Sequence, residues 1–126
     1  MNCIVDSVLV LIKPDAVKVS KQIISEFEQK GFFVLKKRKL VPELDLIKKH
    51  YEEHKDKTFY NDLCAFMVSG KIMALQLDSP TGNAVKIARS MLPDLRSKYG
   101  TDFRRNAVHV SDSNEASERE LKIWFP

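Results

Sequence analysis

Near its start the chain reads SVLVLIKP, residues 7–14, and this stretch decides the fold. Residues 7–12 form a short, uncharged and mostly apolar run, which is typical of a buried strand. Pro14 has no backbone N–H to donate to a sheet, so it ends the run. The sequence therefore predicts a buried strand over residues 7–12, and the other elements can be traced outward from it.

Helical and extended patterns alternate along the rest of the chain. Ile23, Ile24 and Phe27 recur at the spacing of an amphipathic helix. Residues 32–35 predict a second strand, with the basic run of residues 36–39 as its solvated end. The later patterns predict helices from Pro42 and over residues 61–68 and 84–91, strands over residues 72–77 and 107–110, and a last helix through Ala116, Glu120 and Trp124.

Two further expectations concern the limits of the last two helices. Pro93 is expected to end the helix over residues 84–91, with a polar loop from there to Arg105. Asp112, with Glu115 three residues on, is expected to form the capping box of the last helix.

The order of these elements indicates the fold class. Four strands alternate with helices, which favours an α/β (α+β) fold: a ferredoxin-like sandwich with a four-stranded antiparallel sheet and helices packed on it. A doubly wound parallel sheet is the alternative, and four short strands make it the weaker one. A length of 126 residues fits one domain over residues 1–126, with one modest core.

Composition limits the class of partner and the compartment. A formal net charge of +4 suits a polyanion, which includes nucleotides, nucleic acids and anionic membranes. The two cysteines, Cys3 and Cys64, have no metal-ligand or disulfide-framework spacing. The apolar run near the start is too short for a signal peptide, and no stretch approaches a membrane span. We therefore expect a cytoplasmic protein without membrane association.

The glycines exclude one common way of holding phosphate. The chain has four, and they build neither a P-loop nor a dinucleotide-binding loop. Phosphate would therefore have to be held by side chains, and arginine is suited to this because its fork donates two parallel hydrogen bonds.

The three histidines differ in their surroundings. His50 and His54 lie four residues apart, which is a metal-ligand spacing, but no third ligand is evident, so we expect exposed structural residues. His109 lies in a short strand whose alternation sends Val108 and Val110 to the core.

The same alternation sends His109, Ala107 and Ser111 to the opposite face. The last helix can return Glu120 to the ring, and a histidine oriented by a carboxylate is an arrangement for a nucleophile or base. A histidine satisfied in the core is an equal alternative from the pattern alone.

Three stretches carry a resemblance to a known family. NAVHVSDS at residues 106–113 resembles the nucleoside diphosphate kinase signature N-x-x-H-[GA]-S-D-[SG]. IKPD at residues 12–15 resembles that family's first-strand motif, and FEQKGF at residues 27–32 resembles its first helix end. His50-Tyr51, Phe59 and residues 123–125 also match in order, so the resemblance covers nearly the whole chain.

The resemblance implies an activity, a cofactor and an assembly. A nucleoside triphosphate, typically ATP, would give its γ-phosphoryl group to His109, which would pass it to a nucleoside diphosphate in a ping-pong reaction. The family has a ferredoxin-like fold and forms hexamers or tetramers, so a homo-oligomer is expected. Mg²⁺ is carried by the nucleotide phosphates, so no metal site on the protein is expected.

The resemblance also implies roles at matching positions. His109 matches the nucleophile, and Glu120 with Ser111 matches the pair that orients it. The remaining matches are Lys13 on the sugar and γ-phosphate, Asn106 on the sugar, Phe59 under the base, Tyr51 near the nucleophile, and Arg89 and Arg96 on the phosphates.

The chain departs from the family between its two arginines. Only residues 90–95 separate Arg89 from Arg96, where the family has a longer loop with a phosphate-binding threonine and a trimer contact. Arg96 is placed by its ungapped spacing to His109, and Arg104 is the alternative.

Other departures are smaller. Lys57 replaces a phosphate-binding arginine, and residues 18–21 are shorter than usual and lack an arginine-glycine pair. Val110 replaces a small residue and is expected to crowd the nucleotide. The chain ends at Pro126 without the family's C-terminal extension, which is expected to weaken subunit contacts.

Two other functions remain as alternatives. The first is a relative that binds nucleotide but no longer transfers phosphate. The second is an RNA-binding module, because KGFFV at residues 30–34 partly mimics an RNA-recognition motif. It lacks the motif's second aromatic stretch, and the adjacent Phe32 and Phe33 point to opposite faces of a strand. The positive charge still predicts weak, salt-sensitive binding of nucleic acid.

Overall fold

The sheet is antiparallel, as expected. The computed structural model describes residues 6–102 and 105–126, and within these ranges four strands form one sheet in the order β2-β3-β1-β4. The strands are β1 (Asp6–Ile12), β2 (Phe33–Leu40), β3 (Ile72–Ser79) and β4 (Val108–Val110). All three pairings are antiparallel, so the doubly wound parallel alternative is wrong.

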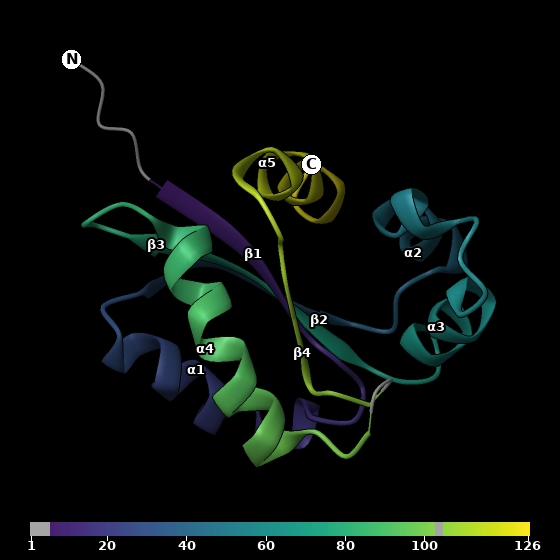
Figure 1. Cartoon of the computed structure of the whole chain (residues 1–126), viewed down its shortest axis with the longest axis horizontal. Helices are drawn as coiled ribbons and strands as arrows, with labels where there is room; N and C mark the ends of the chain where they lie inside the picture. The colour runs from purple at the N-terminus through teal and green to yellow at the C-terminus, as the bar shows by residue number, and fades with distance from the viewer. Residues whose placement is uncertain (1–5, 103–104) are drawn as a thin grey trace.

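Helices cover both faces of this sheet (Figure 1). α1 (Ser20–Gln29) and α4 (Ala84–Tyr99) lie on one face; α2 (Leu44–His50), α3 (Tyr60–Met67) and α5 (Asn114–Trp124) lie on the other. β1 serves both cores by alternation: Val8 and Val10 pack with α1 and α4, while Leu9 and Leu11 pack with the helices opposite. This explains the continuous apolar run, because β1 is buried on both faces.

The second strand is longer than predicted. The basic run of residues 36–39 lies inside β2 rather than at its end, and its side chains are exposed. β2 is an edge strand, where charged side chains reach water without leaving the sheet. A register shift between Val34 and Lys36 marks a bulge at Leu35.

α4 runs straight through Pro93, so the predicted break and the polar loop after it are wrong. Proline removes one helical hydrogen bond. Buried residues on both sides of it, Ala88, Leu92 and Leu95, pack against the sheet and hold the helix together. The loop begins only at Gly100, where an added Cβ would lie 2.9 Å from the Cα of Asn106.

The segment around β4 also differs in detail from the prediction. Ser113, not Asp112, caps α5 by accepting a hydrogen bond from the Ala116 N–H at 3.0 Å. Ala107 precedes β4 with a positive φ of 75° and is buried in the same core as Val108. The expectation that Ala107 shares a face with His109 is therefore wrong, because the strand begins one residue later.

None of the helices in the described ranges combines the length and apolar character that crossing a membrane requires.

Candidate active site

His109 sits at the middle of β4 and faces the side of the sheet covered by α2 and α5. It pairs with Leu11 of β1, whose side chain belongs to that side's core. α5 returns along β1 and brings Glu120 to the ring, with 3.0 Å between His109 Nε2 and Glu120 Oε1. The Ser111 hydroxyl donates to the same oxygen at 2.7 Å. The three residues predicted to form the nucleophile and its orienters are thus together.

These contacts fix which nitrogen of His109 is free. Glu120 Oε1 accepts the Ser111 proton, so it is the acceptor in its contact with His109 as well. The ring proton then lies on Nε2, and Nδ1 keeps its lone pair. The sequence left this choice open, whereas the geometry assigns Nδ1 as the free nitrogen.

The surroundings keep the ring of His109 uncharged. Burial, followed by the positive charges of Lys13, Arg96 and Arg89 in that order, lowers the pKa of His109 to about 3, against the opposite effect of Asp112. A fifth of the side chain, 20%, is still exposed. At neutral pH the site therefore offers an uncharged imidazole lone pair among three cations.

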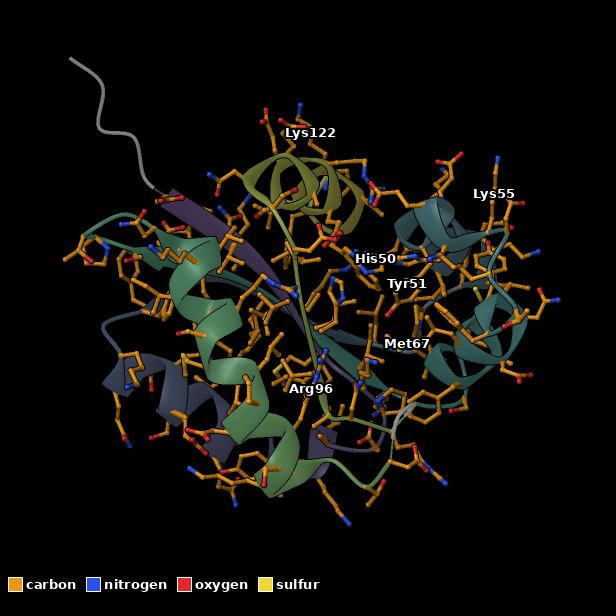
Figure 2. All side chains as sticks on the ribbon, viewed as in Figure 1. His50, Tyr51, Lys55, Met67, Arg96 and Lys122 are labelled. Atoms are coloured by element: carbon orange, nitrogen blue, oxygen red, sulfur yellow. The ribbon has the colours of Figure 1, made fainter. Side chains whose placement is uncertain are left out.

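Arg89 and Arg96 flank His109 from α4. They are seven residues apart, which is two helical turns, so both project from the same face of α4. Arg89 donates to the carbonyl of Val110 at 3.1 Å and Arg96 to that of Val108 at 3.2 Å. Figure 2 shows Arg96 reaching from α4 towards β4. Both guanidinium groups thus cover the outer edge of β4, on either side of the nucleophile; Arg104, the alternative to Arg96, lies outside the described residues.

Lys13 follows β1 directly and is 6% exposed. Its backbone N–H donates to the Ala107 carbonyl at 2.8 Å, while Asp15 accepts from the Ala107 N–H at 3.1 Å. Burial, and then the charge of Arg96, lower the pKa of Lys13 to about 8, against the opposite effect of Asp15. The ammonium group is held close to Arg96, and the two charges together favour a negatively charged ligand.

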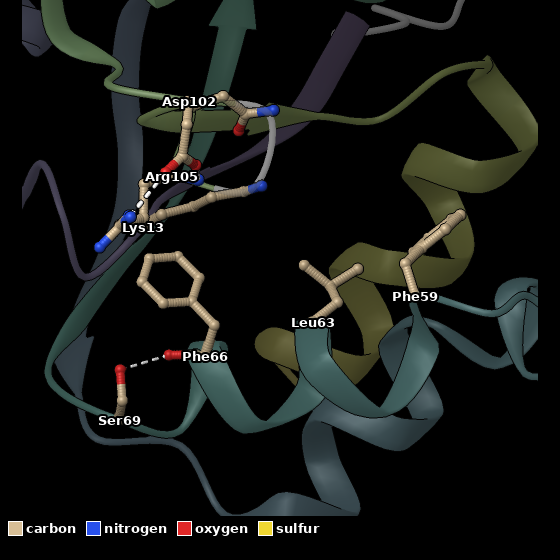
Figure 3. A pocket seen from close by; sticks show the side chains of 8 residues that line it. Lys13, Phe59, Leu63, Phe66, Ser69, Asp102 and Arg105 are labelled. Atoms are coloured by element: carbon tan, nitrogen blue, oxygen red, sulfur yellow. Dashed lines mark hydrogen bonds and ion pairs between the residues drawn. The ribbon is translucent and has the colours of Figure 1, made fainter.

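A pocket of about 760 Å³ opens beside these residues (Figure 3). A volume of this order suits a nucleoside-sized ligand. Lys13, Phe59 and Asn106, which the resemblance assigns to nucleotide binding, line it. Leu63, Phe66, Ser69, Asp102 and Arg105 complete the lining, and the sequence did not single them out. Phe59 is 37% exposed, so one face of its ring is accessible.

Three residues that the sequence analysis placed at the nucleotide do not line this pocket: Lys57, Tyr51 and Val110. Lys57 is exposed and does not line the pocket. Tyr51 is buried, with its ring centroid 6.0 Å from that of His109, and burial raises its pKa. Within the described residues its hydroxyl has no hydrogen-bond partner. Val110 is buried in the core with α4, on the face away from His109, so the expected crowding of the nucleotide is wrong.

The sequence-based prediction for His50 is wrong. The residue was expected to be exposed, but it is 2% exposed and its ring centroid lies 4.6 Å from that of His109. The signal was its position three residues after Ile47, on the buried stripe of the helix. His54 is half-buried and packs near Phe59, with 6.0 Å between ring centroids.

His50, His109 and Glu120 place potential metal-ligating atoms within 4.8 Å of one another. The hydrogen bonds already present argue against a metal there. The indole N–H of Trp124 donates to His50 Nδ1 at 3.0 Å, and Glu120 already accepts from Ser111. A metal on His50 Nε2 would require a proton on Nδ1, facing the indole donor. The three residues are better explained as a hydrogen-bonded and packed network.

The lowered pKa values of His50 and His109 predict loss of stability in acid. The unfolded chain binds protons at these residues from about pH 6.5 downward, while the folded protein does not. Each histidine then removes about 1 kcal/mol of unfolding free energy per pH unit below that value. Urea unfolding at about pH 7, 6 and 5 measures this slope.

His109→Gln is the reference for this slope. The raised pKa of Glu120 stabilises the folded protein in acid and so opposes the effect of the histidines, but it does so in both proteins. The variant should lose less stability in acid than the unsubstituted chain. Equal slopes would show that His109 is not held uncharged by the fold.

The antiparallel sandwich and this histidine site together define a nucleotide-handling phosphotransferase. The sequence model for nucleoside diphosphate kinase matches residues 6–126, so the chain belongs to the nucleoside diphosphate kinase family. Enzymes of this family are phosphotransferases that act on nucleotides and use a divalent cation.

Individual relatives agree with this assignment. The nucleoside diphosphate kinase of Schizosaccharomyces pombe is 40% identical over 95% of this chain and 86% of its own. The cytosolic enzyme of Dictyostelium discoideum is 35% identical, with 90% and 80% covered. The crystal structure of the Aquifex aeolicus enzyme superposes with a TM-score of 0.90 at 27% identity, over 97% of this chain and 96% of that one.

Proposed function

We propose that this chain transfers the γ-phosphoryl group of a nucleoside triphosphate, typically ATP, to Nδ1 of His109 and then to a nucleoside diphosphate. The observation that carries the proposal is the contact of His109 Nε2 with Glu120 Oε1, at 3.0 Å, beside Lys13, Arg89 and Arg96. It leaves an uncharged Nδ1 lone pair as the attacking group.

In the first step, Nδ1 forms a bond to the γ-phosphorus as the bond to the bridging oxygen breaks, and the diphosphate leaves with that electron pair. The ring gains positive charge, which the Glu120 carboxylate at Nε2 stabilises. The second step reverses these bonds with another diphosphate as the acceptor. Phosphoryl transfer depends mainly on alignment and on neutralising the phosphate oxygens, which the three cations supply.

Nucleotide binding can be assigned to the pocket beside His109. Phe59 offers a ring face on which any base can stack, while Lys13 and Asn106 line the wall towards the nucleophile. The buried Tyr51 hydroxyl is a donor near His109. Lys57 lies outside the pocket, so it contributes to nucleotide binding only through the attraction of its positive charge.

The residues around the pocket are compatible with a metal ion that enters the site bound to the nucleotide. The acidic lining residue Asp102 is ion-paired to Arg105 at 2.7 Å. We therefore propose Mg²⁺ held by the nucleotide phosphates, with no metal ligand from the protein. When bound, it neutralises phosphate charge alongside the three cations.

The proposal is tested by labelling the pure protein with γ-labelled ATP. The label should be acid-labile and base-stable, and a nucleoside diphosphate should discharge it as labelled triphosphate. A relative that only binds nucleotide would take up no label while still binding ADP. The RNA-binding alternative is weakened, because Phe32 is 4% exposed and cannot stack on a base.

We further propose a homo-oligomer and a cytoplasmic location. The name of the Dictyostelium relative supports the location. The edge strand β2 supports self-association, because Leu35 within it is 52% exposed and Phe33 is 46% exposed, beside unpaired backbone groups. A hexamer or a tetramer remains the expected size.

Leu35→Glu should reduce the assembly to smaller units, because it places a charge in the surface that copies would share. Light scattering after gel filtration measures the mass of each protein. Leu44→Glu, at an exposed leucine on α2, is the control and should keep the mass of the unsubstituted chain. An unsubstituted chain that runs as a single copy would contradict the proposal.

A further inference from the structure

The ring of His50 is a buried group of the site that the mechanism above does not use. It ends α2 and lies between two other elements, with ring centroids 5.8 Å from Trp124 on α5 and 4.6 Å from His109 on β4. In Figure 2 the side chain lies between α2 and the sheet, next to Tyr51. This position makes His50 a direct neighbour of the proposed nucleophile, His109.

A single hydrogen bond sets the protonation of His50. The indole N–H of Trp124 is a donor only, and it lies 3.0 Å from His50 Nδ1. Nδ1 must therefore carry a lone pair, and the one proton of the neutral ring lies on Nε2. A charged His50 would point a second N–H at the indole N–H, and burial followed by the proximity of His109 also lowers its pKa well below the ordinary value.

The contact between the two histidines is specific in orientation. Their ring planes meet at 77°, so one ring stands edge-on to the other. His50 Nε2 is buried and has no hydrogen-bond partner in the part of the chain that the structure describes, so the ring meets His109 by packing, with ring centroids 4.6 Å apart. An edge-on neighbour blocks rotation of the His109 ring, which would exchange Nδ1 and Nε2 relative to Glu120.

We propose that His50 is a positioning residue for phosphoryl transfer: Trp124 holds it neutral in one tautomer, and its ring braces the ring of His109 with Nε2 on Glu120 and Nδ1 towards the nucleotide. This inference rests on the proposed function. Neutrality matters because His109 gains positive charge as it takes up the phosphoryl group. A cationic ring at this distance would oppose that charge, whereas an uncharged ring does not.

Substitutions at His50 test the brace. His50→Ala should lower the single-turnover rate of His109 phosphorylation by about 10- to 100-fold per folded molecule and leave the ADP dissociation constant within about twofold. His50→Phe keeps an aromatic ring and should recover most of that rate, although the indole N–H loses its acceptor. Ile47→Val, a buried change on the same helix, is the control and should keep the full rate.

Two outcomes of this series overturn the brace. One is a wild-type rate in His50→Ala, and the other is a rate in His50→Phe as low as in His50→Ala. Failure of the proposed function itself would look different, because the unsubstituted chain would then take up no label at all.

Trp124→Phe tests the tautomer by freeing His50 Nδ1. The phosphorylation rate should then fall in acid at a pH where the unsubstituted chain shows no fall, because a free Nδ1 can accept a proton. The charged and titratable groups that face His50 are His109 on β4, Glu120 and Arg119 on α5, Lys13 after β1, and the adjacent Tyr51. Only Glu120 among them favours a charged His50, and it is present in both proteins.

Adding His50→Phe to Trp124→Phe should abolish the acid fall, which would assign it to His50. A flat profile in Trp124→Phe, or a fall that survives in the double variant, would overturn the tautomer assignment. NMR of isotope-labelled histidine in the unsubstituted chain gives the same answer without any activity. A proton on Nε2 of His50 supports the inference, and a proton on Nδ1 overturns it.

Discussion

Replacing His109 with alanine should abolish phosphoenzyme formation and lower the turnover of nucleoside triphosphate synthesis by roughly 10⁴-fold or more. The reason is that no other described side chain can replace it. His50 faces the same space, but its free nitrogen carries the proton and its other nitrogen accepts from Trp124 at 3.0 Å. The measurement is incorporation of label from γ-labelled ATP, together with a coupled assay of triphosphate formation.

His54→Ala is the matched control for this loss. It removes a half-buried histidine four residues after His50, whose ring centroid lies 6.3 Å from that of Tyr51. The variant should take up label like the unsubstituted chain. Label that persists in His109→Ala would place the phosphoryl group on another residue and would remove His109 from the mechanism.

The folded state of His109→Ala is checked by ADP binding. The residues proposed to contact a base and sugar, Phe59, Lys13 and Asn106, line a pocket whose lining does not include His109. ADP affinity should therefore change by less than about tenfold. This separates the loss of a nucleophile from the loss of the site.

The strands were predictable because their signals are local. The apolar run of residues 7–12 and the alternation of residues 108–110 depend on strand geometry alone, and the structure confirms both, whereas Ala107 lies before the strand and does not follow it. α4 was not predictable in the same way. A proline favours a break locally, but the packing of Leu92 and Leu95 against the sheet decides the outcome, and that is a tertiary effect.

The site shows the same division between local and tertiary information. Alternation gave His109 its direction, and the spacing to α5 suggested Glu120. The helical stripe of α2 could indicate that His50 is buried, but not that it contacts His109, because β4 and Trp124 lie far along the chain. Similarly, the short segment between Arg89 and Arg96 looked like a reduced loop, whereas it is a helix that sets the distance between two guanidinium groups.

The second large loss of phosphorylation rate is expected from a substitution on this helix, at Arg96. Arg96→Ala should lower the single-turnover rate of phosphorylation by about 100- to 1,000-fold, because a fixed donor to the phosphate oxygens in the transition state is lost. One guanidinium N–H already donates to the Val108 carbonyl at 3.2 Å. That bond orients the fork beside His109 and leaves other N–H groups for the phosphate.

Arg96→Lys separates charge from geometry at this position. Lysine restores the positive charge but cannot both hold the Val108 carbonyl and present a planar fork, so we expect only partial recovery. Lys98→Ala is the control, because it removes a positive charge from the same helix. Lys98 is ion-paired with Glu26 at 2.9 Å, whereas Arg96 bonds to a carbonyl of β4. Its rate should equal that of the unsubstituted chain.

Arg89→Ala should lower the rate by a similar factor, because Arg89 holds the Val110 carbonyl on the other side of His109 in the same way. If Arg96→Ala keeps the full rate while Arg89→Ala does not, the second phosphate contact belongs to Arg104. If both variants keep it, the phosphate is held without α4, and this helix has no part in the transfer. The two arginines therefore test whether guanidinium groups two turns apart on one rigid helix hold the phosphate during transfer.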